Sequence, residues 1–228
     1  MKTNVFQLID FDRTLFDTTA LIEAILTTIA RTYPDVSSDL KRQSEDAYKE
    51  ERTFMLLRYL REHYGDAWVE ELIGRIVRER GASAFMLPGV YERLQAADDL
   101  STARPSWGIL TYGDVLDQLM KIRIAGLEDA PAHIVTIADK GNLIASWQLE
   151  DGRYRLPPEF GGAIVDALTF EDDKLRVFKG TPEDLIGVWV THREDAKARL
   201  TETNLQNVTI ARDLFESIEH IKARLKNT

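Results

Sequence analysis

The chain has 228 residues, of which 44% are hydrophobic and 29% charged, and its 13 Gly and 7 Pro exclude collagen-like, low-complexity and wholly disordered proteins. This length allows one domain plus a smaller module around a sizeable core. Acidic residues outnumber basic residues by 38 to 29, and the net charge of −9 argues against nucleic acid as a partner; the lack of cysteine excludes disulfides and thiolate chemistry.

The first predicted element is a short apolar run, Val5 to Ile9, which stops at Asp10. A run of this kind is typical of a buried parallel strand that ends at a polar edge. It ends too early in the chain for the apolar part of a signal peptide, and no segment approaches the ~18 consecutive apolar residues of a membrane span. We therefore expect a soluble, cytoplasmic protein with no membrane partner.

Helical periodicity replaces the strand pattern from Asp17 to about Arg80. Apolar residues recur at helical spacing over 21–29, 54–64 and 69–77, and these stretches are followed by Pro34, Gly65 and Gly81 respectively. The polar stretch 38–51 predicts a solvated helix. Because the region contains no strand pattern, it predicts an all-helical module. The sequence locates the boundaries of this module to within ~2 to 4 residues.

After Leu87-Pro88-Gly89 the chain alternates short apolar strands with helical patterns. Such alternation predicts an α/β fold with a parallel sheet covered on both faces. The domains expected are an α/β core of residues 1–16 and 88–228, and a helical domain of residues 17–87. We read residues 148–162 as a surface excursion. The predicted strands are 107–110, 134–137, 164–170, 186–190 and 208–210, and the predicted helices include 115–124 and 215–225.

Ligands of open α/β sheets bind outside the carboxyl ends of the strands, so the polar residues that follow apolar runs are candidates. The first are Asp10 and Asp12. On an extended backbone, residues two apart point to the same side, so both carboxylates can face one reaction centre. One can act as nucleophile while the other gives and takes a proton. The simpler alternative is that the two acids only end the strand.

Two further strand ends carry a hydroxyl and an ammonium group. Thr111 precedes a glycine turn and a helix start, where backbone N–H groups favour an anion; the alternative is a plain cap, with Asp114 beginning the helix. Lys140 follows the predicted strand 134–137 and can neutralise a phosphoryl group. The alternative for Lys140 is an ordinary solvated lysine.

The fourth strand end is acidic. Three consecutive acids, Glu171, Asp172 and Asp173, follow an apolar run. Mg²⁺ commonly takes one or two carboxylates together with water and substrate phosphate oxygens. The alternative is an acidic surface turn.

In this chain order the motifs resemble those of the haloacid dehalogenase-like hydrolase superfamily, most of whose members are Mg²⁺-dependent phosphatases. Asp10 to Leu15 is similar to its D-x-D-x-T-L motif, Thr111 to its second motif, Lys140 to its third and Asp172-Asp173 to its fourth. The segment 85–90 resembles the return from a helical cap inserted after the first motif. The resemblance covers nearly the whole chain and implies a Rossmann-like, three-layer α/β/α core with a helical cap domain.

The resemblance also implies a mechanism. Asp10 would attack phosphorus in a small phosphorylated substrate, and Asp12 would protonate the leaving oxygen and then activate water. Thr111 and Lys140 would hold the phosphoryl oxygens, with Tyr112, Gly113 and Arg13 beside the substrate. The cofactor implied is Mg²⁺, bound by the Asp10 carboxylate, the Asp12 backbone carbonyl, Asp172 and Asp173.

Several alternatives stay open at this point. Arg13 stands where relatives often have glycine, Lys121 competes with Lys140 for the third motif, and Glu171-Asp172 competes with Asp172-Asp173 for the fourth. Dehalogenation is disfavoured, because it is not expected to need Asp12 or a metal site. Phosphonate cleavage would need a reactive lysine in the cap. The alternative from another class is a catalytically weak or inactive protein that acts as a binding or interaction module.

Overall fold

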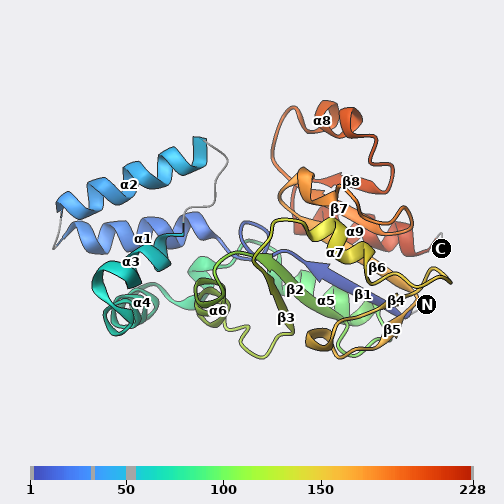
Figure 1. Cartoon of the computed structure of the whole chain (residues 1–228), viewed down its shortest axis with the longest axis horizontal. Helices are drawn as coiled ribbons and strands as arrows, with labels where there is room; N and C mark the ends of the chain where they lie inside the picture. Colours follow the sequence, from blue (N-terminus) through green and yellow to red (C-terminus); the bar gives the residue numbers. More distant parts are fainter. Residues whose placement is uncertain (1–2, 32–33, 50–54, 227–228) are drawn as a thin grey trace. The chain divides into compact units, whose positions relative to one another are not determined.

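The computed structural model describes residues 3–31, 34–49 and 55–226 (Figure 1). The chain forms two compact units. The first contains the chain up to Leu15, Leu87–Tyr112 and everything from Asp129 onward; the second contains Phe16–Met86 and Gly113–Glu128. In the described part of the chain, no helix has the length and apolar character needed to cross a membrane.

The first unit is an α/β unit built on a six-stranded sheet (Figure 1). The strands lie in the order β3-β2-β1-β6-β7-β8, and every neighbouring pair is parallel. Its strands are β1 (Val5–Ile9), β2 (Trp107–Tyr112), β3 (Ala132–Val135), β6 (Ala167–Asp172), β7 (Ile186–Val190) and β8 (Val208–Ala211). Its helices are α5 (Val90–Leu100), α7 (Lys140–Ala145), α8 (Ala196–Thr203) and α9 (Leu214–Leu225), with short 3-10 helices at Pro158–Phe160 and Leu175–Phe178.

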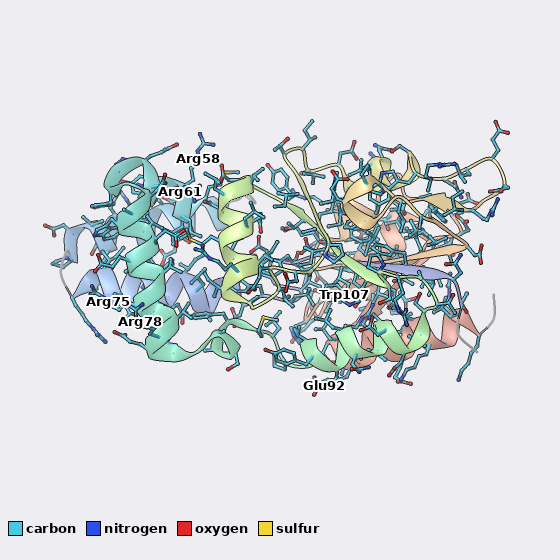
Figure 2. All side chains as sticks on the ribbon, turned by 90° about the horizontal axis from the view of Figure 1, so that it is seen from below. Arg58, Arg61, Arg75, Arg78, Glu92 and Trp107 are labelled. Carbon is cyan, nitrogen blue, oxygen red and sulfur yellow. The ribbon has the colours of Figure 1, made fainter. Side chains whose placement is uncertain are left out.

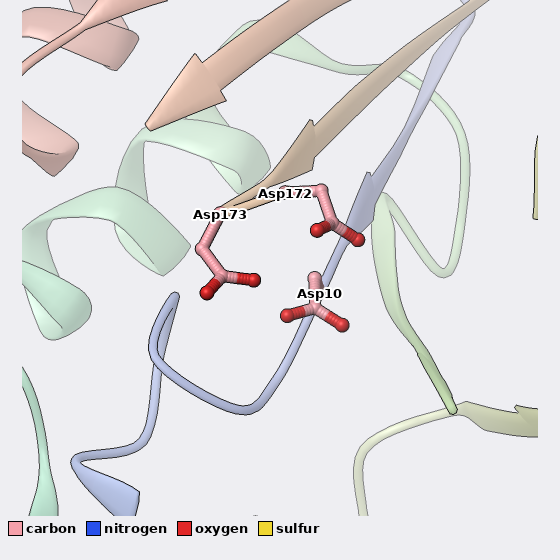
Figure 3. A group of neighbouring side chains, drawn as sticks. All are labelled: Asp10, Asp172 and Asp173. Atoms are coloured by element: carbon pink, nitrogen blue, oxygen red, sulfur yellow. The ribbon is translucent and has the colours of Figure 1, made fainter. Parts of the chain in front are cut away.

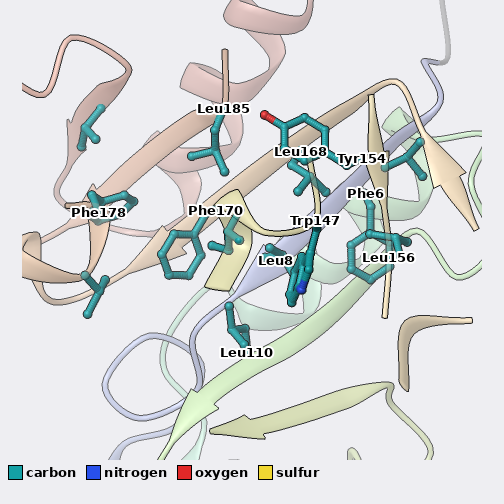
Figure 4. Packing of buried hydrophobic residues seen from close by; sticks show 14 of the residues in the cluster. Phe6, Leu8, Leu110, Trp147, Tyr154, Leu156, Leu168, Phe170, Phe178 and Leu185 are labelled. Carbon is teal, nitrogen blue, oxygen red and sulfur yellow. The ribbon is translucent and has the colours of Figure 1, made fainter. Parts of the chain in front are cut away.

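Helices cover both faces of this sheet, as the alternation of β6 illustrates. Leu168 and Phe170 point into a large apolar cluster that also contains Ile144 of α7 and Ala196 of α8 (Figure 4). Glu171 points the other way, where Ser217 of α9 bonds it. Side chains on a strand alternate between faces, so the unit is a Rossmann-like α/β/α arrangement, as the sequence predicts.

The sequence reading was wrong at one edge strand. The strand expected at 134–137 runs from Ala132 to Val135. It pairs only with β2, whose last residue, Tyr112, faces Val135. Beyond that point no strand of the described residues pairs with this segment, and Ile137 is 75% exposed. The apolar side chain of Ile137 extended the predicted strand beyond the point where the backbone has a pairing partner.

The segment 148–162 is only in part the surface excursion that its glycines and prolines suggest, because it also adds a short ribbon and three side chains to the core. It contains β4 (Tyr154–Arg155), which pairs antiparallel with β5 (Ile164–Val165). Tyr154 and Phe160 are buried in the apolar cluster, and the Phe160 ring lies 5.1 Å from that of Phe6. The strand expected over 164–170 is accordingly divided between β5 and β6. The turn residues mark the bends of a segment in which only Tyr154, Leu156 and Phe160 are buried, whereas its charged residues are exposed.

The second unit is helical. Its elements are α1 (Thr18–Ala30), α2 (Pro34–Lys49), α3 (Leu56–Tyr64), α4 (Asp66–Arg80), a 3-10 helix at Ala82–Phe85, and α6 (Val115–Ile124). The Asp17 side chain accepts from the backbone N–H of Ala20 and caps α1. Gly65 and Gly81, both with positive φ, end α3 and α4. The expected helices are present; Phe54 and residues 50–51 of the predicted stretches lie outside the described residues.

Helix α6 belongs to this helical unit although it follows β2 directly in the chain. Arg61 of α3 donates to Asp114, the residue that caps α6, at 2.8 Å, and also pairs with Asp117 at 2.5 Å. Figure 2 labels Arg58 and Arg61 on α3 and Arg75 and Arg78 on α4. The assignment of residues 17–87 as a cap domain stays a proposal.

Candidate active site

Three adjacent strands bring the predicted acids and the hydroxyl to one edge of the sheet. Asp10 follows the last residue of β1, Thr111 lies near the end of β2, and Asp172 ends β6. In the sheet β1 lies between β2 and β6. Because all three are parallel, their carboxyl ends meet at the same edge. The order of the strands therefore creates the site that the strand-end rule predicts.

Asp10, Asp172 and Asp173 form a carboxylate cluster at this edge (Figure 3). One carboxylate oxygen of each lies within 4.8 Å of the others. Asp10 and Asp172 are almost wholly buried. The Asp10 backbone N–H donates to the carbonyl of Glu171 at 2.8 Å, so β6 fixes the backbone of Asp10. The Thr14 hydroxyl donates to Asp10 Oδ2 at 3.2 Å.

Lys140 neutralises part of this cluster. Its ammonium donates to Asp10 Oδ1 and to Asp172 Oδ2, the latter at 2.6 Å. The side chain is 2% exposed, so Lys140 is not the solvated lysine of the simpler alternative. Lys140 is the first residue of α7, and Gly141 is the second. The backbone of Gly141 lies so close to the residue after the 3-10 helix Leu175–Phe178 that a Cβ would collide with the Lys179 carbonyl.

Burial and like charge shape the titration of the cluster. Burial, aided by Asp172, raises the pKa of Asp10 to about 6, and Lys140 opposes the shift. Burial and the Asp172 charge likewise raise the pKa of Asp173 to about 7. Burial alone would lower the pKa of Lys140, but Asp10 and Asp172 outweigh it and raise that pKa. The site thus holds more carboxylate charge than Lys140 can neutralise.

One pocket collects most of the predicted site residues. Its lining contains Asp10, Asp12, Thr111, Tyr112, Ala138, Lys140, Asp172, Lys174, Arg176 and Val177. Thr111 Oγ1 is buried and has no hydrogen-bond partner in the described structure. A buried hydroxyl without a partner is costly unless a ligand bonds it. Thr111 is therefore a ready donor to an anion in this pocket.

Arg13 and Gly113 are placed less directly. Arg13 has φ +64, in the left-handed region that favours glycine, and it is exposed. Its charge lowers the pKa of Asp173, against the stronger effect of burial. Gly113 is the first residue of the second segment of the helical unit, and with φ +156 it packs against Gln118. The structure thus shows Arg13 in a glycine-like turn beside the acids.

The geometry separates the competing acid pairs. Glu171 is fully buried and is bonded on the opposite face of the sheet: Arg93 Nε donates to it at 2.7 Å and Ser217 Oγ at 2.7 Å. The acids that join Asp10 are Asp172 and Asp173. Among the two lysines, Lys140 reaches Asp10 and Asp172, and Lys121 lies on α6 of the helical unit.

Two cations of the pocket, Lys174 and Arg176, received no role from the sequence. They follow β6 by two and four residues. The strand-end rule that selected Asp172 also selects them, but a mixed charge run does not reveal which members turn inward. Thr14, which donates to Asp10, is in the sequence only one position of the D-x-D-x-T-L motif, and the motif does not predict this hydrogen bond.

The carboxylate cluster fits a hard divalent cation. Its donors are all carboxylate oxygens, the ligands that Mg²⁺ and Ca²⁺ prefer. Asp173 Oδ1 is buried without a hydrogen-bond partner among the described residues. Its ion-pair partner, Lys174 Nζ, lies 3.8 Å away, which is longer than a hydrogen bond. An orphaned carboxylate oxygen beside two further acids is the arrangement that a bound cation satisfies.

Comparison with solved structures identifies the fold. A crystal structure from Burkholderia xenovorans, named as that of a haloacid dehalogenase-like hydrolase, aligns over 97% of this chain and 98% of its own. The TM-score is 0.62 and the sequence identity 20%. A haloacid dehalogenase-like family hydrolase from Xanthomonas campestris aligns over 97% and 92%, with a TM-score of 0.50 and 16% identity. The HAD-hydrolase YfnB from Bacillus subtilis, solved bound to magnesium, aligns over 96% and 99%, with a TM-score of 0.50 and 17% identity.

No protein-family model and no curated protein sequence matches the chain. The similarity to solved structures is therefore one of architecture, extending over nearly the full length of each partner. Together with the parallel sheet and the site at the carboxyl ends of β1, β2 and β6, it shows that the chain has the haloacid dehalogenase-like hydrolase fold.

Proposed function

We propose that the protein is a Mg²⁺-dependent phosphatase that hydrolyses a small phosphorylated metabolite through an aspartyl-phosphate on Asp10. The observation that carries this proposal is the environment of the Asp10 carboxylate. It lies in a pocket with an unpartnered hydroxyl and a buried ammonium group, and it clusters with the carboxylates of Asp172 and Asp173, which suit a cation. Phosphoryl transfer needs mainly such positioning and charge neutralisation.

Asp10 is the proposed nucleophile. One of its carboxylate oxygens forms a bond to phosphorus while the bond from phosphorus to the ester oxygen of the substrate breaks. The hydrogen bonds from Thr14 and Lys140, and that of the Asp10 backbone N–H to Glu171, fix the orientation of the carboxylate. Lys140 also favours the ionised form that attacks, against the pKa rise caused by burial.

Asp12 is the proposed general acid and base. It lines the same pocket as Asp10. In the first step it gives its proton to the departing alkoxide. In the second step it takes a proton from water, whose oxygen attacks phosphorus and breaks the bond to Asp10. Phosphate leaves, and both carboxyl groups return to their starting state.

Thr111 and Lys140 are the proposed ligands of the phosphoryl oxygens. Thr111 Oγ1 has a hydrogen to donate and no partner in the described structure, and the Lys140 ammonium has one donor beyond the two that bond carboxylates. Tyr112 lines the pocket beside them. The phosphoryl oxygens would thus have a hydroxyl and an ammonium as donors when charge spreads over them in the transition state.

Mg²⁺ would be held by Asp10, Asp172 and Asp173, with the backbone carbonyl of Asp12, and when bound it neutralises phosphoryl charge. The YfnB structure, which has the same fold and was solved bound to magnesium, supports this choice of cation. Asp12 in the pocket favours phosphatase over dehalogenase chemistry, because dehalogenation has no expected use for a second acid there. The cytoplasmic location stays a prediction.

The test is phosphate release from a panel of phosphorylated metabolites, with Mg²⁺ or with EDTA. The wild-type protein is expected to release phosphate from part of the panel with Mg²⁺ only. Asp10→Asn is expected to lose at least about a thousandfold in rate, whereas Asp151→Asn, at an exposed surface acid, retains it. Binding of panel members without release in the wild type would contradict the proposal and favour a binding module.

A further inference from the structure

The loop after β6 carries two cations into the pocket. Lys174 and Arg176 both line it. The residues interleaved with them, Leu175 and Val177, belong to the buried apolar cluster. The Lys174 backbone N–H donates to Asp172 Oδ1 at 2.8 Å. The core and the site acid thus hold this loop at both ends and fix where its two cations stand.

Neither Lys174 nor Arg176 forms a close ion pair with a carboxylate of the described chain. The Lys174 side chain is 40% exposed, and its only ion-pair partner in the described structure, Asp173, is 3.8 Å away. The Arg176 side chain is exposed, and no described carboxylate pairs with it. Lys140 differs from both, because it is buried and donates to two carboxylates. Lys174 and Arg176 therefore have hydrogen-bond donors to spare at the mouth of the pocket.

The positive charge of the site exceeds what one phosphoryl group needs. Lys140, Lys174 and Arg176 line the pocket together with the acids, and Arg13 stands beside the acids as well. A divalent cation held by Asp10, Asp172 and Asp173 would therefore give the site a net positive charge. Lys140, Thr111 and the metal already suffice for one phosphoryl group. Two more cations exceed what that group requires.

We propose that Lys174 and Arg176 bind a second anionic group on the substrate, so that the preferred substrates are phosphate esters whose leaving group carries a carboxylate or another phosphate. This rests on the proposed phosphatase function and adds to it the class of leaving group. A guanidinium fork and an ammonium that line one pocket can bond the oxygens of either anion. The chemistry of recognition is shared, and the experiment distinguishes the two anions.

The experiment compares substrates in matched pairs. 3-Phosphoglycerate and glycerol 3-phosphate share a skeleton, and only the first carries a carboxylate. Glucose 1,6-bisphosphate and glucose 6-phosphate differ by a second phosphate. We expect the wild-type protein with Mg²⁺ to favour the doubly anionic member of at least one pair by about tenfold in kcat/KM. The pair that shows the preference identifies the second anion.

Variants assign the preference to the loop. Arg176→Gln and Lys174→Gln are each expected to reduce the ratio of kcat/KM within the responsive pair severalfold, chiefly through KM for the doubly anionic member. Lys197→Gln makes the same charge change at an exposed position of α8 and is expected to preserve the ratio. Ratios within a pair cancel any general loss of activity, including loss through the nearby metal cluster.

A second readout separates this inference from the proposed function. Calorimetric binding of the same pairs to the Asp10→Asn protein with Mg²⁺ needs no turnover. Tighter binding of the doubly anionic member, lost in Asp10→Asn/Arg176→Gln, supports the inference even if no ester is hydrolysed. Phosphate release without preference in either pair leaves the phosphatase proposal intact and overturns the inference. Equal binding of the paired compounds overturns it as well.

Discussion

Glu171 and Asp172 are neighbours on β6, yet their carboxylates bind different cations on opposite faces of the sheet. Glu171 pairs with Arg93 of α5 and accepts from Ser217 of α9, all three fully buried. Asp172 bonds Lys140 of α7. Because side chains alternate between the two faces of β6, Glu171 joins a buried ion pair and Asp172 joins the carboxylate cluster of the candidate active site.

Removal of one partner of the buried ion pair is expected to destabilise the protein strongly. Glu171→Gln leaves Arg93 charged and uncompensated inside the protein, and should lower the free energy of unfolding by about 3–5 kcal/mol. Replacing both residues by apolar ones, Arg93→Met with Glu171→Leu, should recover most of the loss. Urea unfolding measures both. Asp151→Asn, which breaks an exposed pair with Arg153, should change little. A double variant as unstable as the single one would show that the pair itself stabilises the fold.

Mg²⁺ is expected to raise the thermal stability through Asp173. At a concentration one hundred times Kd, a bound ligand adds about 2.7 kcal/mol, which is several degrees in Tm for a chain of this size. Asp173→Asn removes a carboxylate that burial disfavours, so its metal-free Tm should not be lower, yet Mg²⁺ should add nothing. Asp151→Asn should keep the full gain. An equal gain in Asp173→Asn would place the cation elsewhere.

Two glycine-to-alanine substitutions in helices are expected to have opposite signs. At Gly141 the added Cβ meets the Lys179 carbonyl, and the loss should be about 1–3 kcal/mol, with a lower kcat because Lys140 is displaced from Asp10. At Gly74 of α4 the Cβ meets only the end of the Arg78 side chain, and helix propensity should add about 0.5–1 kcal/mol. Chemical denaturation and phosphate release test both. A harmless Gly141→Ala would contradict the close packing of α7.

The turn at Arg13 is expected to tolerate glycine but not a β-branched residue. The left-handed backbone costs an ordinary residue roughly 1–2 kcal/mol. Arg13→Gly removes this strain while the unfolded chain gains freedom, so stability should stay within about 1 kcal/mol. Arg13→Val should be clearly less stable. Comparable unfolding midpoints for the two variants would show that the turn adjusts its backbone.

The sequence predicted the strands and helices where periodicity was strong, as at Val5–Ile9, Ile186–Val190 and Val115–Ile124. It failed at Ile137, because pairing with a neighbouring strand, which is not local, decides where an edge strand ends. It also failed in part over 148–162, where turn residues hide the buried Tyr154 and Phe160. The local sequence pattern indicates apolar runs and turns, but it does not indicate which strands pair or which segments pack against the core.

The site was predictable to the level of strand ends. Asp10, Thr111, Lys140 and Asp172 could be selected because parallel strands end at one edge, and the structure brings all four to one pocket. The choice between Glu171 and Asp173 could not be made, since it depends on the buried Arg93 on a distant helix. Their catalytic and binding roles stay predictions.

The most direct test of the central claim, a phosphorylated Asp10, uses Asp12→Asn with p-nitrophenyl phosphate and Mg²⁺. Nitrophenolate leaves without a proton from Asp12, whereas hydrolysis of the intermediate needs Asp12 as base. We predict a burst of about one nitrophenolate per protein molecule, and mass spectrometry of the acid-quenched protein should find phosphate on the Asp10 peptide. A burst-free reaction, with no phosphate on Asp10 in a folded protein that binds Mg²⁺, would contradict the account.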